Sequence, residues 1–144
     1  MSWEYSRRVK YYETDRMGVV HHSNYLRIIE DARMEWLRDN FMSYSELEKM
    51  GVIIPTASAS GKFVSYLRYD DEFKVIIRLV QFKGVRMEFE YEIINSVNGQ
   101  LCYTGESTHF FAVDGNYKPY LSFRSKFPEL YQKMCLLHEK DTKI

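Results

Sequence analysis

Cysteine, proline and net charge are all scarce in this chain of 144 residues. Two cysteines are too few for a disulfide framework or a zinc site, so we expect both thiols to be reduced. The three prolines stand apart and mark no linker, which favours one domain over residues 1–144. Twenty basic and twenty acidic side chains cancel, and this disfavours a nucleic-acid partner, because such proteins usually carry a basic face.

Long apolar runs are also missing. No stretch approaches the roughly 18 uncharged apolar residues of a membrane span, and the start, Met1-Ser2-Trp3-Glu4, has no apolar signal segment. We therefore expect a cytoplasmic protein without a membrane span. What the chain does contain is 45% hydrophobic and 16% aromatic residues, the composition of a domain that buries one sizeable core.

The first part of the chain predicts one strand and two helices. Residues 6–12 are rich in β-branched and aromatic side chains and precede a polar turn, so they predict an opening strand. Over 23–39, apolar residues recur at spacings of three and four after a Ser-Asn pair that can cap a helix. A shorter helix is expected over 44–50, ending at Gly51, where a left-handed backbone costs little.

From Val52 onward, apolar residues recur at every second position, the period of a half-buried strand. The expected strands are 52–67, 72–82, 87–93, 100–113 and a short last strand, 117–123. Asn98-Gly99 suits a two-residue hairpin turn, and a final helix is expected over 128–138. The order predicts an α+β fold in which one long helix lies across a curved antiparallel sheet. A single such layer exposes aromatic surface, which favours self-association.

The segment Tyr12–Tyr25 concentrates a carboxylate, a glycine and two histidines just before the long helix. Helix N-termini present unpaired N–H groups and a partial positive charge. Asp15 could therefore attack a carbonyl or deprotonate a water while the first helical amides stabilise the oxyanion. The residues alone leave other interpretations open, because Asp15 equally fits a turn-capping aspartate and Gly18 an ordinary loop glycine.

Other polar side chains have ordinary explanations. The adjacent His21 and His22 do not predict a metal site, because sequence neighbours rarely converge on one ion and the remaining histidines add no ligand spacing. Glu30 and Arg33, three apart on the helix, are explained by a surface ion pair or by a part in fixing the helix or a subunit contact. We expect neither a metal nor a cofactor.

The same segment resembles the hotdog-fold acyl-CoA thioesterases, specifically the 4-hydroxybenzoyl-CoA thioesterase and YbgC-like branch. Those proteins open with Tyr-x-Asp-Thr-Asp-x-x-Gly-x-Val-x-His-x-x-Tyr, followed by a helix bearing Glu-x-x-Arg. The matching positions here, in order, are Tyr12, Thr14, Asp15, Gly18, Val20, His22, Tyr25, Glu30 and Arg33. Glu13 is a conservative replacement of the first, non-catalytic aspartate of the motif. The resemblance implies a single hotdog thioesterase domain over 1–144, with the sheet wrapped around one central helix.

The resemblance also implies roles. It makes Asp15 the nucleophile or general base that hydrolyses an acyl thioester to a carboxylic acid and a free thiol. The helix N-terminal amide at His22 would polarise the carbonyl. The residues expected to bind substrate are Gly18, Val20, Tyr25, Tyr66 and Arg86. Where the family has Gly-x-x-Ser, this chain has Met87 in place of the serine, which favours an aliphatic over an aromatic acyl group.

The implied partners are an acyl-CoA substrate, an acyl carrier protein in the alternative, and a second copy of the chain. A homodimer or homotetramer would join sheets side by side, with residues 58–66 of the partner as the opposing wall of each site. An acyl carrier protein thioesterase and a non-catalytic acyl-CoA-binding protein remain the alternatives. Hydration is disfavoured, because His21 and His22 follow Asp15 by six and seven positions rather than by the five of related hydratases.

Overall fold

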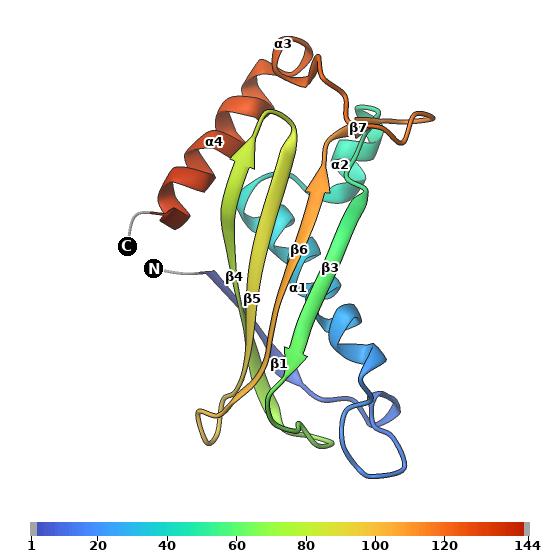
Figure 1. The fold of residues 1–144 in the computed structure, drawn as a ribbon, viewed down its shortest axis with the longest axis vertical. Coiled ribbons are helices and arrows are strands. Elements are labelled where there is room, and N and C mark those ends of the chain that lie inside the picture. The colour runs from blue at the N-terminus through green and yellow to red at the C-terminus, as the bar shows by residue number, and fades with distance from the viewer. Residues whose placement is uncertain (1–2, 143–144) are drawn as a thin grey trace.

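The computed structural model describes residues 3–142, within which five strands form one antiparallel sheet (Figure 1). In sheet order these are β1 (Trp3–Arg8), β4 (Glu72–Lys83), β5 (Arg86–Asn95), β6 (Leu101–Phe110) and β3 (Thr56–Phe63). A separate small ladder pairs β2 (Val52–Ile53) with β7 (Ala112–Val113). The helices are α1 (Ser23–Asn40), α2 (Tyr44–Lys49), α3 (Phe123–Lys126) and α4 (Pro128–Thr142). The predicted α+β fold, a curved sheet around one long helix, is confirmed.

The core lies between α1 and the concave face of the sheet. Alternate side chains of β4 and β5 are buried: Phe73, Val75, Ile77, Leu79, Met87, Phe89, Tyr91 and Ile93. The apolar face of α1 packs on them, with the Trp36 and Phe89 ring centroids 5.0 Å apart. On the outer face, Arg78 and Glu92 form an ion pair of 3.4 Å. The apolar faces that the period of two predicts for β4 and β5 and the period of 3.6 predicts for α1 therefore pack against one another, as predicted.

The opening strand and the third strand differ from their predicted bounds. The first strand is Trp3–Arg8 rather than 6–12, because Glu13 accepts the backbone N–H of Lys10 and closes residues 11–13 into a 3-10 turn. The predicted strand 52–67 is split into β2 and β3 at Ile54-Pro55, where proline has no N–H for a ladder. The predicted strand 100–113 is likewise interrupted, since the N–H of Phe111 donates to the Val85 carbonyl instead.

Two other predictions fail locally. The hairpin between β5 and β6 exists, but its loop has five residues, because the Asn95 side chain accepts the N–H of Val97 and widens the turn. Residues 117–123 form no strand in the described part of the chain. There, Tyr120 donates its N–H to the Phe111 carbonyl, and the Phe123 ring stacks on Phe111 at 4.0 Å. The aromatic residues of this segment anchor it to the core rather than alternating across a sheet.

All three predicted helices, over 23–39, 44–50 and 128–138, are confirmed. Helix α2 ends before Gly51, whose φ of 79° is the left-handed backbone expected there. Helix α4 runs four residues beyond the predicted end and covers β4 (Figure 1). Near its C-terminus, the Asp141 carboxylate accepts the Leu79 N–H at 2.8 Å, where the β4 register shifts. No helix in the described residues has the length and apolar character to cross a membrane.

Strand β3 and the segment before α1 define the end of the fold that matters for chemistry. All eight residues of β3 are exposed, and β6 is the only strand that pairs with it within residues 3–142. The chain leaves β3 at the end of the sheet where α1 begins (Figure 1). There, the N–H of Val20 donates to the Leu67 carbonyl at 2.8 Å. The loop before α1 is thus fixed beside the open edge of the sheet.

Candidate active site

The loop that carries Asp15 is a tight turn. The backbone N–H of Asp15 donates to the Val19 carbonyl at 2.8 Å, and that of Gly18 donates back to the Asp15 carbonyl at 3.0 Å. Gly18 has a φ of 81°, a conformation that side chains with a Cβ rarely adopt. The Asp15 carboxylate is half-buried; its Oδ1 accepts the Met17 N–H at 2.8 Å. Its Oδ2 accepts no hydrogen bond from the described residues, so one oxygen is available for chemistry.

A buried ion pair holds this loop in place. Glu13 is only 3% exposed, and its two carboxylate oxygens each accept a hydrogen bond of 2.8 Å from the Arg7 guanidinium. Its backbone carbonyl accepts the Asn24 side-chain amide at 2.8 Å and the His21 N–H at 2.9 Å. Burial by itself would raise the pKa of Glu13, but the hydrogen bonds from Arg7 and the Lys10 N–H outweigh it and lower that pKa.

The sequence predicted only a conservative replacement at Glu13 and gave no signal of this role. Glu13 joins β1, through Arg7, to the first turn of α1, through Asn24. No local pattern signals the Arg7–Glu13 pair, because the two residues belong to different elements. Its structural consequence is that the carboxylate of Asp15 and the start of α1 are fixed relative to the same buried anchor.

The N-terminus of α1 offers an unpaired amide. The N–H of Ser23 contacts the His21 ring at 3.2 Å, and the N–H of Asn24 donates to the His21 carbonyl at 2.9 Å. The N–H of His22 donates to no acceptor among residues 3–142. A backbone N–H without a protein acceptor, at an exposed residue at the positive end of an 18-residue helix, is suited to hold a carbonyl oxygen that gains negative charge.

Aromatic side chains line the space beside this amide. The buried Tyr25 ring stacks on Tyr103 with centroids 5.1 Å apart, and the exposed Phe63 ring lies 5.3 Å from Tyr25. The His22 ring meets the same Phe63 edge-on at 6.5 Å. Burial raises the pKa of Tyr25 to about 12, so its hydroxyl is neutral at physiological pH. These rings connect the end of β3 to the start of α1 by an apolar wall.

The structure brings most of the predicted site residues together. Asp15, Gly18 and His22 share the loop and helix start, and Val20 is buried, with its backbone bonded to Leu67. Tyr66 precedes Leu67 and is 67% exposed at the open edge. Arg86 lies elsewhere in the chain: it begins β5 at the opposite end of the sheet (Figure 1), with its guanidinium 6.0 Å from the Phe110 ring.

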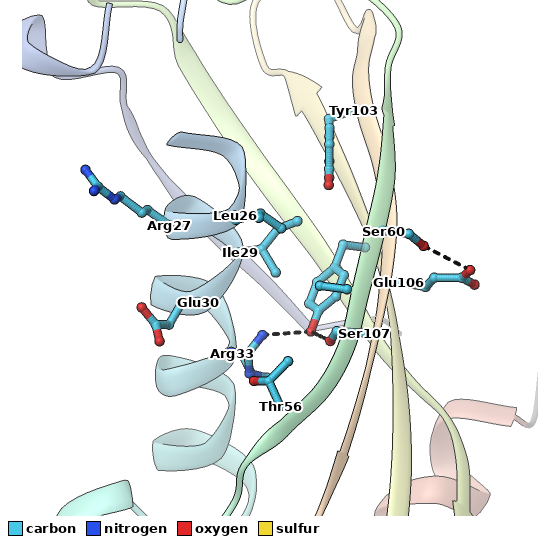
Figure 2. Close-up of a pocket in the computed structure, with 12 residues that line it drawn as sticks. Leu26, Arg27, Ile29, Glu30, Arg33, Thr56, Ser60, Tyr103, Glu106 and Ser107 are labelled. Atoms are coloured by element: carbon cyan, nitrogen blue, oxygen red, sulfur yellow. Dashed lines mark hydrogen bonds between the residues drawn. The ribbon is translucent and has the colours of Figure 1, made fainter. Parts of the chain in front are cut away.

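A cavity of about 230 Å³ lies between α1, β3 and β6 (Figure 2). Leu26, Ile29 and Arg33 point from α1 toward the sheet, whereas Arg27 and Glu30 point away from it. The surface ion pair, one of the explanations given for Glu30 and Arg33, is therefore not formed among residues 3–142, and a part in fixing the helix or a subunit contact stays a prediction. Arg33 is only 9% exposed, and its Nη1 donates to the Tyr91 hydroxyl at 3.1 Å. Its helix position turns it inward rather than along the surface.

Behind Arg33, buried polar groups form a continuous chain. The Tyr91 hydroxyl is 2.5 Å from Ser107 Oγ, which is 2.7 Å from His109 Nε2. The other ring nitrogen of His109 is 3.2 Å from the Thr56 hydroxyl. Burial, followed by the charge of Arg33, lowers the pKa of His109 to about 3, so this histidine is neutral. The sequence signal was polar residues at alternate, inward positions of β6, which the strand prediction did not use.

No three His, Cys, Asp or Glu side chains in the described part of the chain form a group that could hold a metal ion. The loop and helix start offer a carboxylate and a backbone amide without a protein acceptor among residues 3–142. These groups suit addition to a polarised carbonyl.

Comparisons with known proteins agree with this chemistry. A model of the thioesterase-like superfamily matches residues 9–129. YneP of Bacillus subtilis, provisionally named an acyl-CoA thioesterase, is 32% identical over 121 residues, or 84% of this chain and 86% of YneP. The acyl-CoA thioester hydrolase YbgC of Escherichia coli is 30% identical over 91 residues, or 63% of this chain and 68% of YbgC.

A solved structure gives the same result for the fold. The DHNA-CoA thioesterase of Staphylococcus aureus superposes with a TM-score of 0.84 at 27% identity, covering 98% of this chain and 95% of that one. The hotdog fold expected from the motif is thereby confirmed. The family match spans both the Asp15 loop and the sheet around α1. This chain belongs to the thioesterase-like superfamily, and it is a thioester hydrolase.

Proposed function

We propose that the substrate is an acyl-CoA, and that Asp15 and the His22 amide carry out its hydrolysis. The observation that supports this most directly is the free N–H of His22 at the start of α1, next to a loop that holds a half-buried carboxylate. A thioester needs both functions: a donor for its carbonyl oxygen and a base or nucleophile for its carbon.

The reaction adds one water across the carbon–sulfur bond. In one route, an Asp15 oxygen attacks the carbonyl carbon, the thiolate leaves and takes up a proton, and water then hydrolyses the mixed anhydride. In the other, Asp15 removes a proton from water, the hydroxide attacks, and that proton passes to the leaving thiolate. In both routes the His22 N–H donates a hydrogen bond to the oxyanion, which the dipole of α1 also stabilises.

The carrier in this proposal is coenzyme A. Arg16, Lys62 and Arg68 are exposed near the open edge and form no ion pair within residues 3–142, so they are available to phosphate groups. The names of YneP and YbgC support the same carrier. An acidic acyl carrier protein would use the same basic side chains, so the alternative is tested by comparing one acyl group on both carriers.

A second copy of the chain would complete the site. Strand β3 presents an exposed edge without a partner strand in the described residues, and such edges readily pair with another chain. Antiparallel pairing of two β3 strands would place Phe63 of one chain beside Thr56 of its neighbour. It would also bring the Arg86 end of the neighbour to the Asp15 end of the first chain. A homodimer thus gives Arg86 a place near substrate.

The test of the catalytic assignment is thiol release from short aliphatic, long aliphatic and aromatic acyl-CoAs. Asp15→Asn removes the charge with little change in shape, so we expect kcat to fall by about 10²- to 10⁴-fold. Asp114→Asn, in an exposed turn, is the matched control. Equal activity of Asp15→Asn and the unaltered chain would remove Asp15 from the mechanism. If the chain cleaves acyl carrier protein thioesters but no acyl-CoA, the carrier is an acyl carrier protein rather than coenzyme A.

The test of the assembly is the mass in solution, measured by light scattering. Ser58→Lys places charge on the exposed strand β3 at a residue that does not line the cavity, and it is expected to weaken the dimer. If the unaltered chain is a monomer that hydrolyses acyl-CoA, the proposed role of a second copy is refuted while the role of Asp15 stands.

A further inference from the structure

The cavity between α1, β3 and β6 changes character along its length. At the end nearer the start of α1 it is lined by Leu26, Ile29 and Tyr103 (Figure 2). Tyr103 stacks on Tyr25, so this end continues the aromatic wall of the Asp15 site. Further along α1 the lining becomes polar, with Arg33 facing the sheet. An acyl group held at the His22 amide would enter by the apolar end and reach toward the polar one.

Arg33 is a buried cation without a carboxylate partner. Within residues 3–142 it forms no ion pair, and its side chain makes one hydrogen bond, to the Tyr91 hydroxyl. Of the two carboxylates at this cavity, Glu30 points away from the sheet (Figure 2). The other, Glu106, lies beyond β3, where it accepts a hydrogen bond from Ser60 at 3.2 Å. Neither neutralises the guanidinium.

The surroundings of Arg33 cannot supply the missing charge. The groups behind it are the hydroxyls of Tyr91 and Ser107 and the neutral ring of His109. A buried charge is costly unless it is paired and fully hydrogen-bonded. A guanidinium has five N–H donors in a plane and matches a carboxylate with two parallel hydrogen bonds. The missing partner therefore has the chemistry of a carboxylate that arrives with the ligand.

We propose that the acyl group ends in a carboxylate, so that the substrate is a CoA monothioester of a dicarboxylic acid, and that Arg33 selects it. This rests on the proposed function of the Asp15 site. Arg33 follows His22 by eleven positions, about 16 Å along the helix axis. Its side chain leans back toward the helix N-terminus, which shortens the span. Because the Arg33 side chain and the hydrogen bonds at both ends take up part of this distance, a dicarboxylic acyl chain of medium length, such as suberoyl, is the expected size.

The experiment compares kcat/KM for suberoyl-CoA and octanoyl-CoA, which differ only in the terminal carboxylate. The unaltered chain is expected to prefer suberoyl-CoA. Arg33→Met is expected to lower the ratio of the two constants by about tenfold to a hundredfold, the effect of losing a charged hydrogen-bonded contact. Arg33→Lys keeps the charge and should retain part of the ratio. Arg38→Met, on the exposed side of the same helix, should leave the ratio unchanged.

The outcomes separate this inference from the proposed function. If octanoyl-CoA is cleaved as well as or better than suberoyl-CoA, the inference is overturned and the acyl-CoA hydrolase remains. The same holds if Arg33→Met changes both constants equally, as it would if a partner subunit neutralised Arg33. If no thioester is cleaved, the proposed function fails. Calorimetric binding of free suberate, compared with octanoate, then tests whether Arg33 binds a carboxylate. Suberate binding that is lost in Arg33→Met supports the carboxylate site, and absence of suberate binding overturns it.

Discussion

Two arginines lie inside this fold in opposite electrostatic situations. Arg7 meets the carboxylate of Glu13 through two hydrogen bonds of 2.8 Å, and its guanidinium also lies 5.1 Å from the centre of the Phe73 ring. Within the described residues, the Arg33 side chain has one hydrogen-bond partner, the hydroxyl of Tyr91. Both belong to well-packed regions, one at the edge of the sheet beside α1 and the other at the cavity between α1 and β3.

The difference separates a structural role from a binding role. The Arg7–Glu13 pair is complete within one chain, and it fixes the loop that carries Asp15. Arg33 is incomplete within one chain and faces a cavity of about 230 Å³. A completed pair stabilises the fold only while both members are present. An incomplete one costs free energy of folding, and this cost is recovered when a ligand supplies the missing partner.

The largest expected effect is on the completed pair. Arg7→Met leaves the Glu13 carboxylate buried without its partner, so the free energy of unfolding should fall by about 3–5 kcal/mol. Urea unfolding followed by circular dichroism measures it. The double variant Arg7→Met/Glu13→Met removes both charges and should recover most of the loss. A double variant as unstable as the single one would show that packing around Arg7, rather than the charge pair, supports the loop.

A smaller effect is expected from pH, because protonated Glu13 still fills its space. The pKa of Glu13 is lowered from 4.5 by folding, so its contribution is fully present above that value and is lost as pH falls through the folded-state pKa. The unaltered chain should therefore lose more stability below pH 4.5 than Glu13→Gln does. Thermal unfolding across this range measures the slope, and parallel slopes for the two chains would contradict the assignment.

The same comparison shows what the sequence could predict. The spacing of apolar residues along 23–39 was enough for α1, and the motif around Asp15 was enough for the family and the loop. The strands β4 and β5 followed from strict alternation. These features are local, since each depends on the period or the order of neighbouring residues.

What the sequence did not reveal depends on contacts between distant elements. Glu13 looked like a conservative replacement because its partner Arg7 lies in another element. A surface ion pair with Glu30 was one explanation for Arg33, because three-residue spacing fits it, but the position of Arg33 on α1 turns the side chain inward. Ser107 and His109 interrupt the apolar side of β6, and only the folded chain shows that they continue from Arg33.

Replacing Arg33 should change the free energy of unfolding in the opposite direction from replacing Arg7. Arg33→Met replaces an unpaired buried charge by an apolar side chain, so the free energy of unfolding should rise by about 1–2 kcal/mol. Urea unfolding of the two methionine variants, at Arg7 and at Arg33, makes the contrast direct. A loss of several kcal/mol at Arg33 would mean that its charge is already neutralised in the assembled protein.

The smallest expected effect on the free energy of unfolding is that of replacing Tyr91, the neutral partner of Arg33. Burial raises the pKa of this hydroxyl, so it stays neutral, and it joins Arg33 to Ser107 without adding charge. Tyr91→Phe should lower the free energy of unfolding by about 1 kcal/mol, the net value of a neutral hydrogen bond. Combined with Arg33→Met it should cost less, because no guanidinium is then left without its only partner. If the changes caused by the two substitutions simply add in the double variant, Tyr91 supports Ser107 and His109 rather than Arg33, and a double-mutant cycle measured by urea unfolding distinguishes the two cases.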